Sequence, residues 1–154
     1  MPPCLLLALA LLGTACAGHP TPCHPQNIPM APGREGRRFQ YAVVTRRLSY
    51  QAAQWNCQKE LQGQLASVHS AARNQELQEL AQTYTSRSLW IGAVTRPKGN
   101  QSGSHWEDAS PWNYANWAPT QPCRLFTTCT TLSARDGLWR SRPCFQLRPF
   151  ICQY

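Results

Sequence analysis

CRLFTTCTTLSARDGLWRSRPCFQLRPFICQY, residues 123–154, is the stretch that decides the fold. It combines four cysteines with five arginines and a single acid, Asp136. The closing run, residues 149–154, is apolar and typical of a β-strand. The four cysteines predict a small scaffold held together by disulfides, and the arginines predict that it carries a cationic surface.

The start of the chain reads as a targeting segment. A short apolar run is followed by Ala15-Cys16-Ala17, a small-x-small cleavage pattern. The run is too short to cross a bilayer, so residues 1–17 are predicted to be a secretory signal peptide. The mature protein is therefore expected to be secreted and extracellular, with storage in secretory granules as a further expectation. Residues 18–38 hold five prolines and predict an extended arm that ends in the dibasic pair Arg37-Arg38, a weak candidate for processing.

The charge balance is strongly basic. The chain has 15 Lys and Arg against 7 Asp and Glu, a net charge of +8, and all of them follow residue 17. Thirteen of the basic residues are arginines, whose forked guanidinium group pairs with carboxylate and sulfate oxygens. This balance predicts a polyanionic partner, and nucleic acid is not expected to be it. The alternative is a solvated basic surface that has no dedicated ligand.

The periodicity predicts an α+β domain with two helices and a mostly antiparallel sheet. Residues 39–45 alternate like a strand, and Ser49 and Ser70 are predicted helix caps. Gly63 is expected to end the first helix. A short strand at 65–68 separates the helices, and later strands are expected at 89–92, 105–108, 127–132, 137–140 and 150–152. The long loops are 96–104, which contains the glycosylation sequon at Asn100, and 109–122.

Catalytic motifs are missing from this sequence. It contains no Gly-x-Ser-x-Gly, no His-Glu-x-x-His and no phosphate-binding glycine loop. Glu107 and Asp108 are neighbours in a predicted strand, where adjacent side chains point to opposite faces. They would make a poor general acid and base, and His69 is interpreted as a packed or surface residue. No enzyme activity is expected.

Several motifs occur in the order found in one family. These are Trp90-Ile91-Gly92, the spacing of the last three cysteines, and a tryptophan shortly before Cys144. On these motifs, residues 39–154 resemble a C-type lectin-like domain. The resemblance implies a C-type lectin-like fold with the disulfides Cys57–Cys152 and Cys129–Cys144.

Within that family the chain looks most like the major-basic-protein branch (eosinophil major basic protein, or bone marrow proteoglycan). The similarity lies in the loop 112–117, in Gln121-Pro122 and in Trp139-Arg140. Phe39 departs from the pattern, because these relatives have a cysteine there. The resemblance implies calcium-independent binding of sulfated, heparan sulfate-type glycans, action on anionic membrane surfaces and a role in innate defence.

The positions that bind calcium in other family members are altered here. Calcium-dependent members use a Glu-Pro-Asn or Gln-Pro-Asp triplet and a Trp-Asn-Asp triplet, whereas this chain has Gln121-Pro122-Cys123 and Trp139-Arg140-Ser141. Calcium needs six to eight oxygen ligands, so sulfur and a guanidinium are poor replacements. We therefore expect no calcium, no other metal and no cofactor.

The same changes suggest an anion site. Candidate ligand-binding residues are Arg124, Arg140, Arg142 and Gln121, with Trp112 and Tyr114 as stacking faces. The alternative for Trp112 and Trp117 is that they form the core of the loop. Two other functions stay open: a calcium-dependent sugar-binding lectin, and a structural protein of the extracellular matrix or of mineral.

Two of the six cysteines after residue 17 have no partner in the family pattern. They are Cys23 and Cys123. They are predicted either to form an extra disulfide with each other, which would pin the arm against the long loop, or to link two chains as a dimer. A single band at monomer mass on a non-reducing gel would exclude the dimer.

Overall fold

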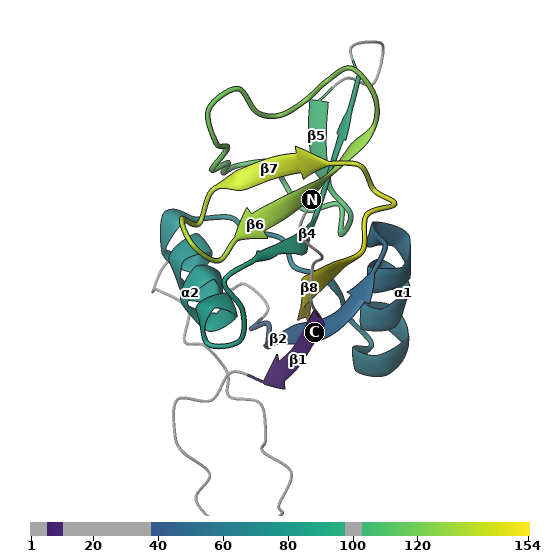
Figure 1. Ribbon diagram of the computed structural model, residues 1–154, viewed down its shortest axis with the longest axis vertical. Helices are drawn as coiled ribbons and strands as arrows, with labels where there is room; N and C mark the ends of the chain where they lie inside the picture. Colours follow the sequence, from purple (N-terminus) through teal and green to yellow (C-terminus); the bar gives the residue numbers. More distant parts are fainter. Residues whose placement is uncertain (1–5, 11–37, 98–102) are drawn as a thin grey trace, which may run out of the picture.

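The computed structural model describes residues 6–10, 38–97 and 103–154. Its elements are shown in Figure 1 and run in the order β1 (Leu6–Ala10), β2 (Tyr41–Leu48), α1 (Tyr50–Leu61), β3 (Gln64–Leu65), α2 (Ala71–Gln82), β4 (Ser88–Arg96), β5 (Gly103–Trp106), β6 (Thr128–Ser133), β7 (Trp139–Arg142) and β8 (Arg148–Gln153). None of the described helices is long and apolar enough to cross a bilayer. Cys23, Arg37 and Asn100 lie outside the described residues, so the predictions made for them stay predictions.

The described strands form one sheet, in the order β1-β2-β8-β4-β6-β7, with β3 paired to β8 and β5 paired to β4. Every pairing is antiparallel except that of β4 with β8. The helices α1 and α2 lie at opposite sides of this sheet (Figure 1). The α+β class with two helices and a mostly antiparallel sheet is confirmed. β1 falls within residues 1–17, and the assignment of these residues to a signal peptide remains a prediction.

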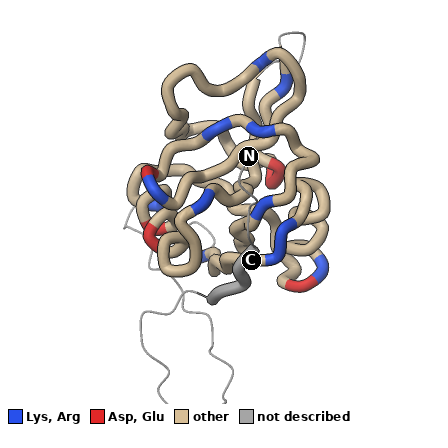
Figure 2. Tube along the Cα trace, viewed as in Figure 1, with Lys and Arg blue, Asp and Glu red and all other residues tan. Residues whose placement is uncertain are grey.

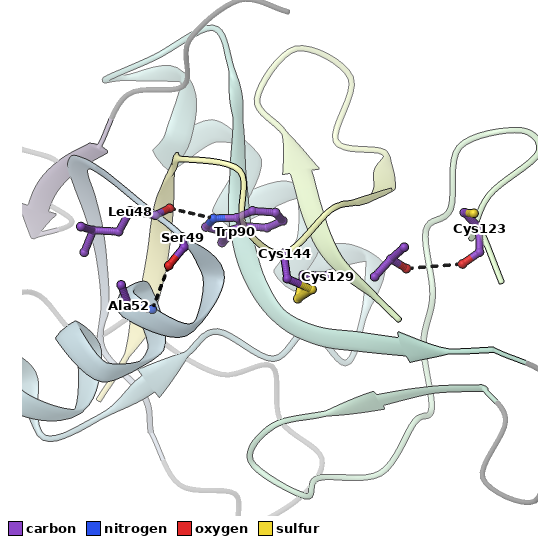
Figure 3. Close-up of a disulfide and its surroundings, with 8 residues drawn as sticks. Leu48, Ser49, Ala52, Trp90, Cys123, Cys129 and Cys144 are labelled. Carbon is purple, nitrogen blue, oxygen red and sulfur yellow. Dashed lines mark hydrogen bonds between the residues drawn. A yellow bond between two sulfur atoms is a disulfide. The ribbon is translucent and has the colours of Figure 1, made fainter. Parts of the chain in front are cut away.

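Both helices begin at the serines expected to cap them. The Ser49 hydroxyl accepts a hydrogen bond from the Ala52 N–H at 3.4 Å, and the Ser70 hydroxyl accepts one from the Arg73 N–H at 3.1 Å. These bonds satisfy donors that have no partner within the first turn of a helix. Figure 3 shows the first of the two caps beside Trp90.

The predicted end of α1 is wrong by one residue. Gln62, not Gly63, takes the left-handed backbone conformation that ends the helix, with a φ of 53°. Gly63 is needed for a different reason, since a Cβ at this position would lie 2.0 Å from the carbonyl oxygen of Gln153. Glycine here allows the chain leaving α1 to approach β8 closely.

Predicted strand boundaries also shift, and β4 (88–96) is longer than the expected strand at 89–92. The expected strand at 65–68 is the two-residue β3, and the one at 105–108 ends at Trp106, so Asp108 lies outside it. β7 runs over 139–142 rather than 137–140, because Asp136 and Gly137 belong to the turn that precedes it. Arg140 and Arg142 are therefore alternate residues of one strand and point to the same face.

Apolar side chains fill both sides of the sheet. One buried cluster involves α2 and contains Leu77, Trp106 and Trp139, with the aromatic side chains of the 109–122 loop packed against it. The other involves α1 and contains Trp90, Phe150 and the disulfide Cys57–Cys152. The predicted disulfides are confirmed, with Cα–Cα distances of 5.5 Å for Cys57–Cys152 and 5.1 Å for Cys129–Cys144.

Candidate functional site

The long loop, residues 109–122, is anchored to the domain through Trp139. This residue is completely buried, and its indole N–H donates to the Asn74 Oδ1 at 2.7 Å. Four aromatic rings lie with their centroids 5.5–6.0 Å from its own: Trp106, Trp112, Tyr114 and Trp117. Such an edge-to-face cluster fixes the loop by packing. The structure thus favours a core role for Trp112 and Trp117, and Tyr114 is also partly buried.

The segment 121–123 is held along β7 by polar contacts. The Gln121 Oε1 accepts a hydrogen bond from the Ser141 N–H at 2.9 Å. In return, the Ser141 Oγ accepts one from the Cys123 N–H at 3.0 Å. Ser141 lies between Arg140 and Arg142, so the predicted residues Gln121, Arg140 and Arg142 are brought to one region. Figure 2 shows basic positions along β7 and in the loops above it.

The residues at the altered triplet positions do not fit a calcium ion. The side-chain oxygens of Gln121 and Ser141 already accept hydrogen bonds that hold the loop. Cys123 offers sulfur, and Arg140 carries a fixed positive charge, whereas calcium needs several carboxylate or carbonyl oxygens. Within residues 38–97 and 103–154, the acids, histidines and cysteines form no group of three that could hold a metal.

The three candidate arginines differ in their exposure and in their hydrogen-bond partners. Arg140 is bound by Asp136, with Nη2 2.9 Å from Oδ2 and Nη1 3.3 Å from Oδ1. Arg142 is partly buried, and its Nε atom has no hydrogen-bond acceptor among the described residues. Arg124 is exposed, and it has no acidic partner in the described part of the chain. The guanidinium groups of Arg124 and Arg142 are therefore the ones that can receive an anion without first losing a carboxylate.

Cys123 lies in the same segment but apart from the disulfide Cys129–Cys144, as Figure 3 shows. It forms no disulfide with another cysteine of the described residues. Its predicted partner, Cys23, lies outside them. The internal bridge and the linked dimer therefore both stay predictions.

A serine, a histidine and an aspartate meet in a cleft beside the end of α1, an arrangement that the sequence spacing did not indicate. The Ser67 hydroxyl is 2.6 Å from the Asp108 Oδ2 and 3.1 Å from the His69 Nε2. Burial would raise the pKa of Asp108, but hydrogen bonds from Ser110, Ser67 and Gln153 outweigh it, so this pKa is lowered. The Ser67 hydroxyl donates to the Asp108 carboxylate, and the His69 ring contacts the Ser67 Oγ through Nε2 and the Asn113 Oδ1 through Nδ1, the latter at 2.8 Å. The cluster ties Asp108 to the sheet.

Comparison with known proteins agrees with this architecture. The family model described as the lectin C-type domain matches residues 46–154. Eosinophil granule major basic protein 1 of Cavia porcellus is 40% identical over 116 residues, which cover 74% of this chain and 50% of that protein. The chain spans about half the length of the major basic protein relatives that it matches.

Two further similarities extend over more of the chain. The type-2 ice-structuring protein of Hemitripterus americanus is 31% identical over 160 residues, covering 97% of this chain and 93% of that protein. The crystal structure of human lithostathine superposes with a TM-score of 0.67 at 25% identity, covering 88% of this chain and 97% of that one. This chain therefore belongs to the family of proteins that contain a lectin C-type domain.

Proposed function

We propose that this protein binds acidic, sulfated glycans without calcium, through the surface formed by β7 and the segment 121–124. The observation that carries the proposal is the state of Arg142. Arg142 directly follows the altered triplet Trp139-Arg140-Ser141 on β7, and its Nε has no acceptor among the described residues. A buried donor without a partner costs free energy, which a sulfate or carboxylate oxygen would recover once the Arg142 side chain turned toward it.

The charge distribution supports the same ligand class. Arg124 and Arg142 belong to segments that Gln121 and Ser141 hold together, while the net charge of the chain is +8. A polyanion bound by several arginines displaces counterions from its own atmosphere, so its binding weakens steeply as salt rises. Trp112 and Tyr114 are partly buried and pack against the core. We assign them to the support of the loop.

The resemblance to the major-basic-protein branch leads us to propose a secreted protein with a role in innate defence. Eosinophil granule major basic protein 1 is the relative that supports this setting. The proposed activity is binding and not catalysis, because the family model that matches the chain describes a lectin domain.

Removing two arginines tests the site. The variant R124A/R142A is expected to elute from immobilised heparin at lower salt than the unaltered protein. The slope of log affinity against log salt should fall by about 1.5–2, since each lost contact releases roughly one counterion fewer. Two quantities are measured for each protein: the salt concentration at which it elutes, and its binding constant at several salt concentrations.

The matched control is R46A/R47A. Arg46 and Arg47 are exposed on β2, which is separated from β7 by three strands of the sheet, so the same charge is lost elsewhere. This control should keep most of the retention. Equal losses in the two double variants would show that the basic surface acts as a whole, without a dedicated site.

A further inference from the structure

The turn between β6 and β7 carries a carboxylate in the place where a ligand anion would bind Arg140. Asp136 contacts the guanidinium through both carboxylate oxygens, at 2.9 and 3.3 Å. Its Oδ1 also accepts the Leu138 N–H at 3.0 Å, which fixes the side chain within the turn. The pair lies at the surface, with exposed side-chain fractions of 29% for Arg140 and 42% for Asp136. It is thus reachable by a ligand.

This carboxylate stays charged at any physiological pH. Hydrogen bonds from Arg140 lower the pKa of Asp136 to about 2 and exceed the effect of partial burial, which would raise it. The same interaction raises the pKa of Arg140. Since both groups keep their charge, acidification above about pH 3 does not release the arginine.

We propose that Asp136 is an intramolecular competitor that reserves Arg140 for densely sulfated polymers. The inference rests on the proposed function and describes how that site chooses among acidic glycans. An isolated carboxylate of a ligand would replace an identical group that the turn already holds in position. The exchange gains nothing and loses the advantage of an intramolecular contact.

A densely sulfated polymer binds this surface differently from a polymer with isolated carboxylates. It can contact Arg142 and Arg124 together with Arg140, and each contact adds counterion release. Exposed ion pairs are weak, so several simultaneous contacts are enough to displace Asp136 from Arg140. Arg140 therefore adds affinity for polymers with closely spaced sulfates and adds little for polymers with sparse carboxylates.

The test is the variant D136N, studied in the full secreted chain. Asparagine keeps an oxygen to accept the Leu138 N–H but removes the negative charge from Arg140. The matched control is E79Q, which removes one negative charge from an exposed residue of α2. Binding constants are measured at low salt, where charge alone retains every variant, on heparin and on hyaluronan, a polymer with carboxylates and no sulfate.

D136N is expected to bind hyaluronan about two- to fivefold more tightly than E79Q does, the range of an exposed ion pair. A gain of the same order is expected on heparin, because this polymer no longer has to displace Asp136 from Arg140. The double variant D136N/R140A should lose the gain. Equal constants for D136N and E79Q on both polymers would overturn the inference, as would a gain that survives R140A. Failure of the proposed function would be recognised in a separate experiment: R124A/R142A and R46A/R47A would then lower the salt concentration of elution from heparin equally.

Discussion

Replacing Trp139 with alanine is expected to lower the free energy of unfolding by about 3–5 kcal/mol, the range for a large buried aromatic side chain. The side chain is completely buried, and four other aromatic rings pack against it. Its backbone is used as well, because the Trp139 N–H donates to the Asn116 carbonyl and the Trp139 carbonyl accepts the Ala118 N–H. The variant should therefore also loosen residues 109–122. Chemical denaturation measures the first effect, and hydrogen exchange of the loop measures the second.

Two further variants separate the contributions at this position. W139F keeps a ring but leaves the Asn74 Oδ1 without its donor, which should cost about 1–3 kcal/mol. W55A removes the same side chain from a site on α1 where it is 58% exposed, and it should change stability by no more than about 0.5 kcal/mol. If W139A were no more harmful than W55A, Trp139 would not be the residue that anchors the loop.

Removal of the Cys57–Cys152 disulfide in the variant C57A/C152A is expected to cost about 4–5 kcal/mol. The two cysteines are 95 residues apart, and the bond restrains the unfolded chain more strongly when the closed loop is longer. The bond also joins α1 to β8 within the buried cluster of Trp90 and Phe150. The measurement is the free energy of unfolding in denaturant without reductant.

The control for this prediction is C129A/C144A. That pair closes a separation of 15 residues, so its removal should cost about 3 kcal/mol, less than the longer loop. A larger loss for C129A/C144A would mean that local packing, and not restraint of the unfolded chain, decides the contribution of these bonds.

Features that depend on neighbouring residues could be predicted from the sequence. Ser49 and Ser70 cap their helices through bonds to backbone groups three residues away. Both disulfides followed from the family pattern of cysteines, and the altered calcium positions could be read as two triplets. Gly63 was recognised as special, but its reason is contact with Gln153, which is 90 positions further along the chain.

Features that join distant segments could not be predicted in this way. Ser67 meets Asp108 and Gln153 across 41 and 86 residues, so no local pattern indicates the cluster. The state of Arg140 was missed for another reason. Asp136 was noted as the single acid of its stretch, but its contact with Arg140 depends on the turn that brings both side chains to one side of β7.

The most direct test of the central claim is retention of the secreted, disulfide-bonded protein on heparin over a salt gradient, with calcium and then with a chelator. We predict elution well above physiological salt and no effect of the chelator, because arginines and not calcium hold the anion. Elution near physiological salt would contradict a dedicated site. Retention that the chelator abolishes would contradict the assignment of Gln121, Cys123 and Arg140 to a surface without calcium.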